Sequence, residues 1–134
     1  MSKVVKFGGS SLADAKQFRK VADIIHADPE RKYVVPSAPG KRFKEDTKVT
    51  DMLYRCYDEV AVQGKDFTEA FAPIRERYNG IISDLGLTLN LDEEFAKIGE
   101  NFKAAVGSDY AASRGEYLNG IVLANYLGFE SVSY

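Results

Sequence analysis

The sequence predicts an α/β fold in which a parallel β-sheet is covered by helices. Two short runs support the sheet. Lys3–Phe7 contains valine and phenylalanine and stops at two glycines, and residues 33–35 stop at Pro36. Longer stretches, with apolar residues three and four positions apart, support the helices. A strand, a helix and a second strand in this order are typical of parallel strands joined by a crossover helix.

The first predicted helix covers residues 11–27. Its apolar stripe consists of Phe18, Val21, Ala22 and Ile25. Ser10 or Ser11 is expected to cap this helix, because a serine hydroxyl can accept a hydrogen bond from a free N–H of the first turn. Pro29 ends it, since the residue before a proline avoids the helical conformation. After the second strand, a polar loop is expected over residues 37–49.

Four more helices are predicted, over residues 50–63, 67–85, 92–106 and 109–127. Thr50 is expected to cap the first of them and Gly64 to end it. The aromatic residues expected in the core of the second are Phe67, Phe71 and Tyr78. Gly128 should stop the last helix, and residues 129–134 look like the start of a third strand. Because a natural domain rarely ends within a strand, the sequence is interpreted as a piece of a longer protein.

The composition is that of a globular domain, with 45% hydrophobic and 28% charged residues. A net charge of −2, spread along the chain, argues against nucleic-acid binding. No apolar run is long enough to span a membrane, and the start lacks the apolar core of a signal peptide, so a cytoplasmic protein is expected. One cysteine and one histidine leave no disulfide and no zinc site. Cys56 is expected to be a buried, inert thiol.

The first local signal for chemistry is the segment Lys6-Phe7-Gly8-Gly9-Ser10-Ser11, in which a strand runs through two glycines into a helix. Glycines allow the backbone to approach a ligand closely, and the first free N–H groups of a helix attract anions. A lysine at the end of a buried strand would be costly unless a phosphate neutralised it, which favours a phosphate site. The alternative is that Lys6 lies on an edge strand and reaches solvent.

A second signal is Glu116, in a helix that is apolar on nearly all sides. Glu116 shares a helix face with Ser113 and Gly120, which suggests room for a cationic group such as an ammonium. The alternative is a structural ion pair with Arg114 or with a lysine elsewhere. The basic loop, residues 41–48, likewise has two interpretations: a solvated surface loop, or a mobile flap over an anionic ligand.

Three segments together resemble the aspartokinases. They are residues 6–11 (KFGGSS), residues 34–41 (VVPSAPGK) followed by residues 50–53 (TDML), and residues 113–118 (SRGEYL). The resemblance covers the whole chain but only about the first half of the family's catalytic region. It implies an αβα layered sandwich of the amino-acid-kinase type. In it, residues 1–134 would form the amino-terminal lobe that holds the amino acid, without the ATP lobe and the regulatory ACT domains.

The resemblance also implies a reaction. Aspartokinases transfer the γ-phosphate of MgATP to the β-carboxylate of L-aspartate, giving aspartyl-4-phosphate, the first step toward lysine, methionine and threonine. The implied ligands are therefore L-aspartate, ATP and Mg²⁺, with no metal site of the chain's own, and the complete enzyme is expected to be a homo-oligomer. This piece alone is expected to be inactive, because the nucleotide lobe is missing from it.

The resemblance places the phosphate end of the site at Lys6, Gly8, Gly9 and Ser10, with Lys6 as the catalytic lysine. It places the substrate-binding end at three other residues, Ser37, Thr50 and Glu116. The two hydroxyls would lie near the aspartate, and the carboxylate of Glu116 would bind its α-ammonium.

Two departures from the family pattern stand out. Residues 41–49 form a longer connection than many members have, and Asn119 replaces an expected serine, which is interpreted as a tolerated change. Two other functions remain as alternatives. One is a related kinase acting on glutamate, acetylglutamate or a nucleotide, against which the segment SRGE argues, and the other is a small-molecule-binding fragment without catalysis.

Overall fold

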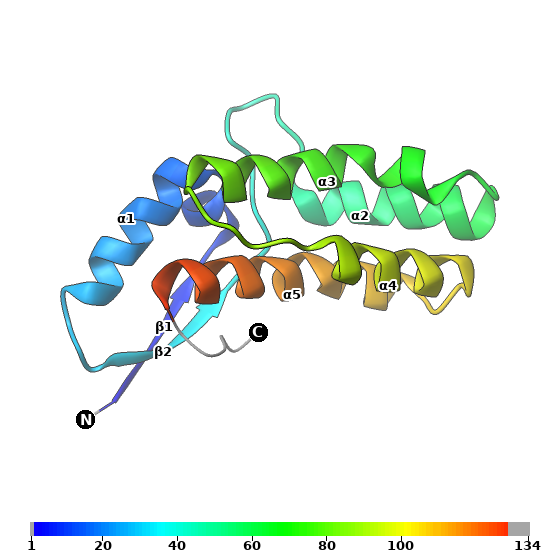
Figure 1. The fold of residues 1–134 in the computed structure, drawn as a ribbon. Coiled ribbons are helices and arrows are strands. Elements are labelled where there is room, and N and C mark those ends of the chain that lie inside the picture. Colours follow the sequence, from blue (N-terminus) through cyan, green and yellow to red (C-terminus); the bar gives the residue numbers. More distant parts are fainter. Residues whose placement is uncertain (1, 129–134) are drawn as a thin grey trace.

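Residues 2–128 of the computed structural model are described, and they form a two-stranded parallel sheet covered on one face by helices (Figure 1). Strand β1 (Lys3–Phe7) pairs with β2 (Arg31–Pro36), and Val5 lies opposite Val34. Helix α1 (Ala15–His26) connects the two strands. The predicted class, a parallel sheet with helices, is confirmed.

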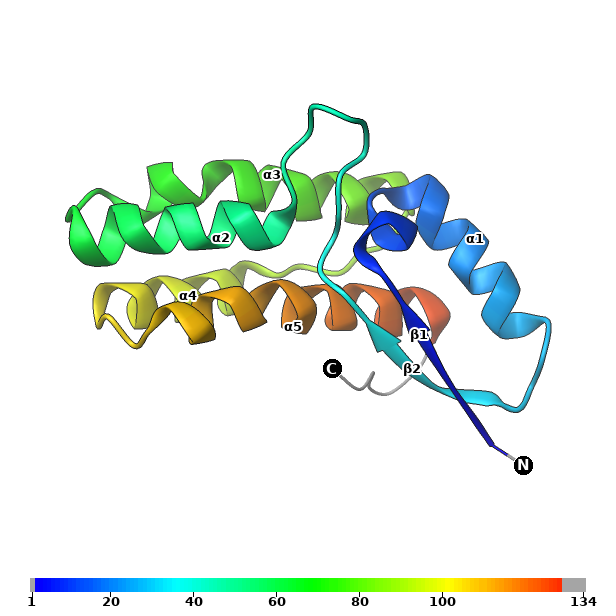
Figure 2. The same cartoon turned by 180° about the vertical axis from the view of Figure 1, so that it is seen from behind.

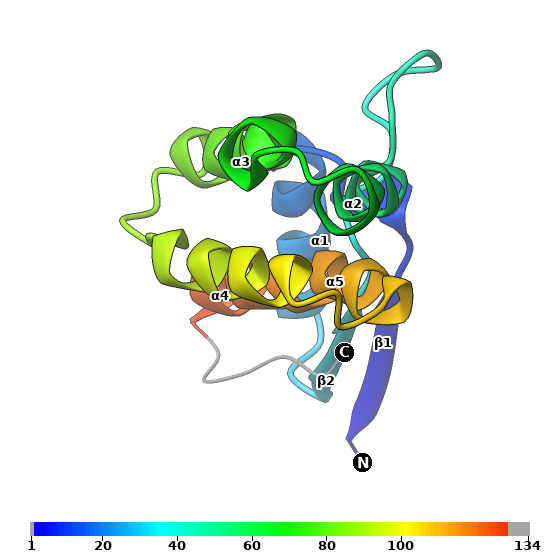
Figure 3. The same cartoon turned by 90° about the vertical axis from the view of Figure 1, so that its right-hand side faces the viewer.

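The remaining elements form a helical layer beside the sheet. They are the 3₁₀ turn η1 (Gly9–Leu12), α2 (Val49–Tyr57), the π-helical extension η2 (Asp58–Val62), α3 (Phe67–Asp84), α4 (Asp92–Lys103) and α5 (Ser108–Leu127). Figure 3 shows these helices on one side of the two strands. Helix α5 packs against both α2 and β2, and the loop between β2 and α2 projects from the body of the molecule (Figure 2).

Alternation along the strands determines which side chains face the helices. Val5 and Phe7 pack against the core, and Val34, the partner of Val5, is 1% exposed. On the opposite face Val4 and Tyr33 remain 68% and 54% exposed. Within residues 2–128, this second face of the sheet is therefore open.

Both predicted helix caps are wrong. Helix α1 begins later than expected and is capped by Asp14, whose side chain accepts a hydrogen bond of 3.0 Å from the N–H of Gln17. Ser10 and Ser11 lie instead in η1, the 3₁₀ turn that precedes α1 and whose Gly9 is hydrogen-bonded to the loop after β2. Helix α2 begins at Val49, so Thr50 lies in its first turn rather than at the cap.

The helices pack through a buried aromatic cluster, which confirms the core predicted for Phe67, Phe71 and Tyr78. The rings of Phe67 and Phe71 stack at 4.8 Å, and Phe71 meets Phe95 edge to face at 5.1 Å. Cys56 is buried as expected, and burial raises the pKa of its thiol to about 12.

The last helix ends as predicted at Gly128, which adopts the left-handed conformation with φ of 77°. The third strand expected over residues 129–134 lies outside the described residues. Among the helices that the structure describes, none combines the length and apolar character needed to cross a membrane.

Candidate functional site

The turns that follow the two parallel strands are bonded to each other. The N–H of Ser37 donates to the carbonyl oxygen of Phe7 at 3.1 Å, and the N–H of Gly40 donates to that of Gly9 at 2.8 Å. A Cβ atom on Gly40 would lie only 2.6 Å from the carbonyl carbon of Gly9. The two backbones can approach this closely only because both positions are glycine.

Helix α5 reaches the same place through a third glycine. A Cβ atom on Gly115 would lie 2.7 Å from the Cβ atom of Ala38, so the helix backbone touches the loop after β2. The buried hydroxyl of Tyr78 donates to the carbonyl oxygen of Gly115 at 2.9 Å, and burial raises the pKa of Tyr78. The three segments that suggested the family resemblance therefore meet at the carboxyl ends of the strands.

Asn119 has a role at this junction that the sequence did not indicate. It is fully buried, and its Nδ2 donates to the carbonyl oxygen of Ser37 at 2.7 Å. Its Oδ1 is also buried and has no hydrogen-bond partner in the described part of the chain. Asn119, which replaces the expected serine, thus fixes the backbone of Ser37, a predicted substrate-binding residue. The sequence offered only a weak signal, a polar residue within the mostly apolar run from residue 117 to residue 123.

Arg77 is the second functional candidate that sequence reasoning missed. Its side chain is 3% exposed, although it projects from the middle of α3. It donates to the carbonyl oxygens of Ala13 at 3.0 Å and Thr47 at 3.2 Å, and also to that of Gly40. The sequence contained a signal for this buried arginine. Arg77 lies three residues after Ile74 and four before Ile81, both buried, which places a cation on an apolar helix face.

The basic loop is folded around an ion pair. Asp46 accepts hydrogen bonds from Arg42 through Nε at 2.6 Å, Nη2 at 2.9 Å and the backbone N–H at 3.0 Å. The side-chain bonds from Arg42 hold the pKa of Asp46 well below its ordinary value. Lys41 and Lys44 are exposed. The loop therefore combines a structured centre with solvated lysines.

Lys6 lies on the open face of the sheet, and its side chain is exposed. The expectation of a buried lysine is wrong for residues 2–128, because strand alternation turns Lys6 away from the side that the helices cover. Gly8 and Ser10 are also exposed, and Gly9 is half-buried. The described residues therefore show the alternative, in which Lys6 reaches solvent from an edge strand, and the glycine turn lies beside it.

Glu116 is exposed, although α5 buries much of its surface. The suggested ion pair with Arg114 is not formed. The guanidinium of Arg114 lies instead 4.6 Å from the ring centres of both Tyr110 and Tyr117. Ser37 and Thr50 are half-buried. The structure thus brings Ser37 to the glycine turns and leaves the carboxylate of Glu116 accessible to solvent.

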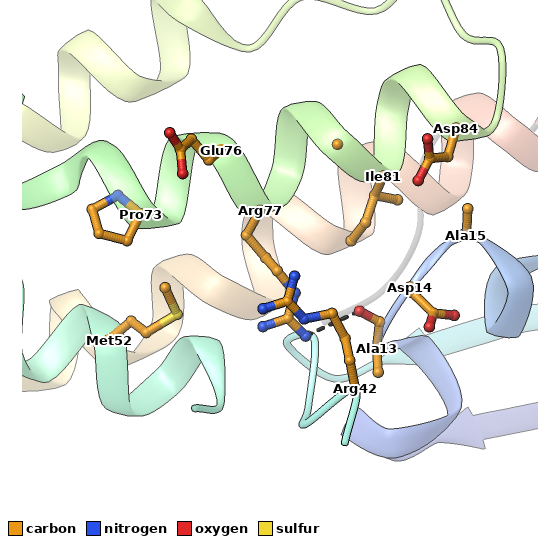
Figure 4. Close-up of a pocket in the computed structure, with 11 residues that line it drawn as sticks. Ala13, Asp14, Ala15, Arg42, Met52, Pro73, Glu76, Arg77, Ile81 and Asp84 are labelled. Carbon is orange, nitrogen blue, oxygen red and sulfur yellow. Dashed lines mark hydrogen bonds between the residues drawn. The ribbon is translucent and has the colours of Figure 1, made fainter. Parts of the chain in front are cut away.

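A hollow of about 410 Å³ lies between the segment that leads into α1, the helices α2 and α3, and Arg42 of the basic loop (Figure 4). Its lining contains none of the predicted site residues. Arg42 and Arg77 both line it and both approach Asp46, at 2.6 Å and 3.6 Å, and three acids, Asp14, Glu76 and Asp84, also line it. Since charges of both signs are present, the lining does not favour an anion. No group of three metal-ligating side chains occurs among the described residues.

Comparison with known proteins gives a consistent set of relatives. Residues 1–133 match the model of the "Amino acid kinase family". The chain is 39% identical to aspartokinase 3 of Bacillus subtilis (strain 168), over 97% of this chain and 30% of that protein. It therefore spans less than a third of the length of this curated relative.

Two crystal structures are also similar. Clostridium acetobutylicum aspartate kinase matches with a TM-score of 0.88 at 50% identity, over 95% of this chain and 29% of that one. E. coli aspartokinase III in complex with aspartate and ADP matches with a TM-score of 0.72 at 25% identity, over 96% and 29%. The fold seen here is thus found within much longer enzymes.

Proposed function

The chain belongs to the amino acid kinase family, and from that premise we propose that it is the substrate-binding lobe of an aspartate kinase. The complete enzyme would transfer the γ-phosphate of ATP to the β-carboxylate of L-aspartate and release aspartyl-4-phosphate. The observation that carries the proposal is the meeting of the three aspartokinase-like segments, through Gly9, Gly40 and Gly115, at the carboxyl ends of the strands. The 50% identity to an aspartate kinase supports this choice of substrate.

At the phosphate end, the ammonium of Lys6 would neutralise the transferring phosphoryl group. Its exposure on the open sheet face is compatible with this role, because the nucleotide would be brought there by the rest of the enzyme. Gly8, Gly9 and Ser10 would let the backbone approach the phosphates. Phosphoryl transfer depends mainly on positioning and charge stabilisation, which a lysine beside a fixed turn can supply.

At the amino-acid end, Glu116 would bind the α-ammonium of aspartate, and the hydroxyls of Ser37 and Thr50 would lie near it. The exposed carboxylate of Glu116 supports this, since no ion pair with another described residue would have to be displaced by a substrate. Asn119 holds the carbonyl of Ser37, so that part of the site is fixed before substrate binds. A fixed site loses less entropy on binding.

The second lobe, with the ATP site, and the regulatory ACT domains would lie outside this chain. Mg²⁺ would enter with the ATP phosphates, and the described residues gather no three-ligand group of their own to hold it. The complete enzyme would be a cytoplasmic homo-oligomer that acts in the biosynthesis of lysine, threonine and methionine. Glutamate or acetylglutamate as substrate is less favoured, because the relatives reported above are aspartate kinases.

The test uses the complete enzyme that contains this chain. Purified protein with ATP is expected to form ADP when aspartate is added, and hydroxylamine should trap the acyl phosphate as a hydroxamate. Glutamate and N-acetylglutamate serve as matched controls and should give no product. ADP formation with glutamate but not with aspartate would contradict the proposal. Residues 1–134 alone should be inactive, because Lys6 and the nucleotide site must be held together.

A further inference from the structure

Arg77 joins helix α3 to two backbone segments that are far from it in the sequence, the end of η1 and the basic loop. Its Nη2 donates to the carbonyl oxygens of Ala13 and Gly40, and its Nη1 donates to that of Thr47. Ala13 directly follows η1, whereas Gly40 and Thr47 lie on either side of the turn of the basic loop. A planar guanidinium with five donors can hold three acceptors in one fixed arrangement, which a lysine ammonium does less well.

A buried cation at this position is not explained by stability alone. A whole buried ion pair can often be replaced by apolar residues of similar size with no loss of stability, so such a pair is weak evidence for a purely stabilising role. Asp46 compensates part of the charge at 3.6 Å from Nη1, and the Nε atom has no hydrogen-bond partner in the described part of the chain. The guanidinium therefore bonds mainly to backbone carbonyl oxygens, and its main effect is to fix the positions of those carbonyl groups.

The backbone carries this effect to the phosphate end of the proposed site. Gly40, held by Arg77 through its carbonyl, donates its own N–H to the carbonyl oxygen of Gly9. Ala13 lies three residues after Ser10. Arg77 therefore fixes the glycine turn from two directions, although its side chain is buried behind the turn. Figure 4 shows it beside Ala13, joined by a dashed line.

We propose that Arg77 is a positioning residue for phosphoryl transfer, one that holds the turn at Gly9 and Ser10 through the backbone of Gly40 and Ala13. The inference rests on the proposed function. Arg77 need not touch substrate; its effect would be to keep the turn and Lys6 in the geometry that the transfer requires. Since small misplacements cost large factors in rate, the effect should be kinetic and not only structural.

The kinetic test compares three variants of the complete enzyme. Arg77→Met keeps the approximate length but removes all donors, and Arg77→Lys keeps the charge but loses the planar fork. Arg75→Met is the matched control, because Arg75 lies on the same helix but bonds outward to Asp92 at 2.9 Å. For Arg77→Met, kcat per folded molecule should fall by roughly 10- to 100-fold. The KM for aspartate should change less, Arg77→Lys should recover part of the rate, and Arg75→Met should keep it.

Hydrogen exchange provides a second readout that does not require activity. The Gly40 amide should exchange faster in Arg77→Lys and Arg77→Met than in the unmutated enzyme, and should be unchanged in Arg75→Met. An unchanged kcat together with an unchanged Gly40 amide would overturn the inference, and Arg77→Lys decides it if Arg77→Met does not fold. If the unmutated enzyme makes no ADP with aspartate, the proposed function fails. Exchange at Gly40 then still decides whether Arg77 holds the turn.

Discussion

The backbone N–H of Gly40 donates a 2.8 Å hydrogen bond to the carbonyl oxygen of Gly9. This bond joins the turn after β1 to the loop after β2, beside the predicted phosphate-binding residues. Neither backbone has room for a side chain at this contact, since a Cβ atom on Gly9 would lie 3.0 Å from the carbonyl oxygen of Ala38. The two turns therefore behave as one unit, so a substitution that displaces the backbone of one turn should also displace the other.

Gly40→Ala should destabilise the protein by about 1–3 kcal/mol, because the new methyl group would overlap the backbone of Gly9 and Ser10. Gly8→Ala is the matched control: its φ is −76°, and a Cβ atom there would meet nothing within 4 Å. It should leave the free energy of unfolding unchanged or raise it slightly. Urea unfolding of both variants checks this, and equal stabilities would show that the turns are not in close contact.

Gly115→Ala should also destabilise the protein, by roughly 1–3 kcal/mol, since its methyl group would push Ala38 and Leu53 away from α5. Gly80→Ala, within α3, is the control because a Cβ atom there meets nothing within 4 Å. The control should stabilise its helix by about 0.5–1 kcal/mol. Thermal unfolding compares the two, and a stable Gly115→Ala would mean that α5 does not touch the loop.

The sequence predicted those features that depend on local pattern. Strand β1, the five helices and the stop at Gly128 follow from periodicity and glycine chemistry. The buried contacts of Arg77 and Asn119 were not predicted, because they depend on segments that approach from elsewhere in the chain. The cap at Asp14 is a local contact with Gln17, three residues on, and the sequence analysis placed the cap at the earlier serines instead. The burial of Lys6 was predicted wrongly, since strand alternation alone does not say which face the helices cover.

Asp46 should make an acid-sensitive contribution to stability. Its pKa is held below the ordinary value in the folded state, so its contribution is present above about pH 4 and lost as the pH falls toward the folded value. Asp46→Asn should therefore cost about 1 kcal/mol at pH 7. This difference from the unmutated protein should shrink between about pH 5 and pH 2. Urea unfolding across this range checks it, and a constant difference would contradict the ion pair.

Lys6→Met in the complete enzyme should reduce kcat by roughly 10²-fold or more, as expected when a preorganised charge stabiliser is lost. Stability should be unaffected, because the Lys6 side chain is exposed. Lys3→Met is the control on the same strand: the ammonium of Lys3 bonds to Asp28 at 2.7 Å on the surface, so the variant should keep its rate. Equal rates for both variants would remove Lys6 from the reaction.

Asn119→Asp should show the opposite pH dependence to Asp46→Asn. The two side chains have the same shape, but a carboxylate cannot donate to the carbonyl oxygen of Ser37, and at this fully buried position its charge would be uncompensated. The variant should lose about 1–3 kcal/mol at pH 7. Burial would raise the folded-state pKa of the new carboxyl group above its unfolded value of about 3.9. The loss should therefore be full well above that pH and smaller below it, where the protonated group can again donate to Ser37. Unfolding free energies measured against the unmutated protein from pH 7 to pH 4 test this, and a penalty that grows on acidification would mean that Asn119 does not hold the loop through its N–H.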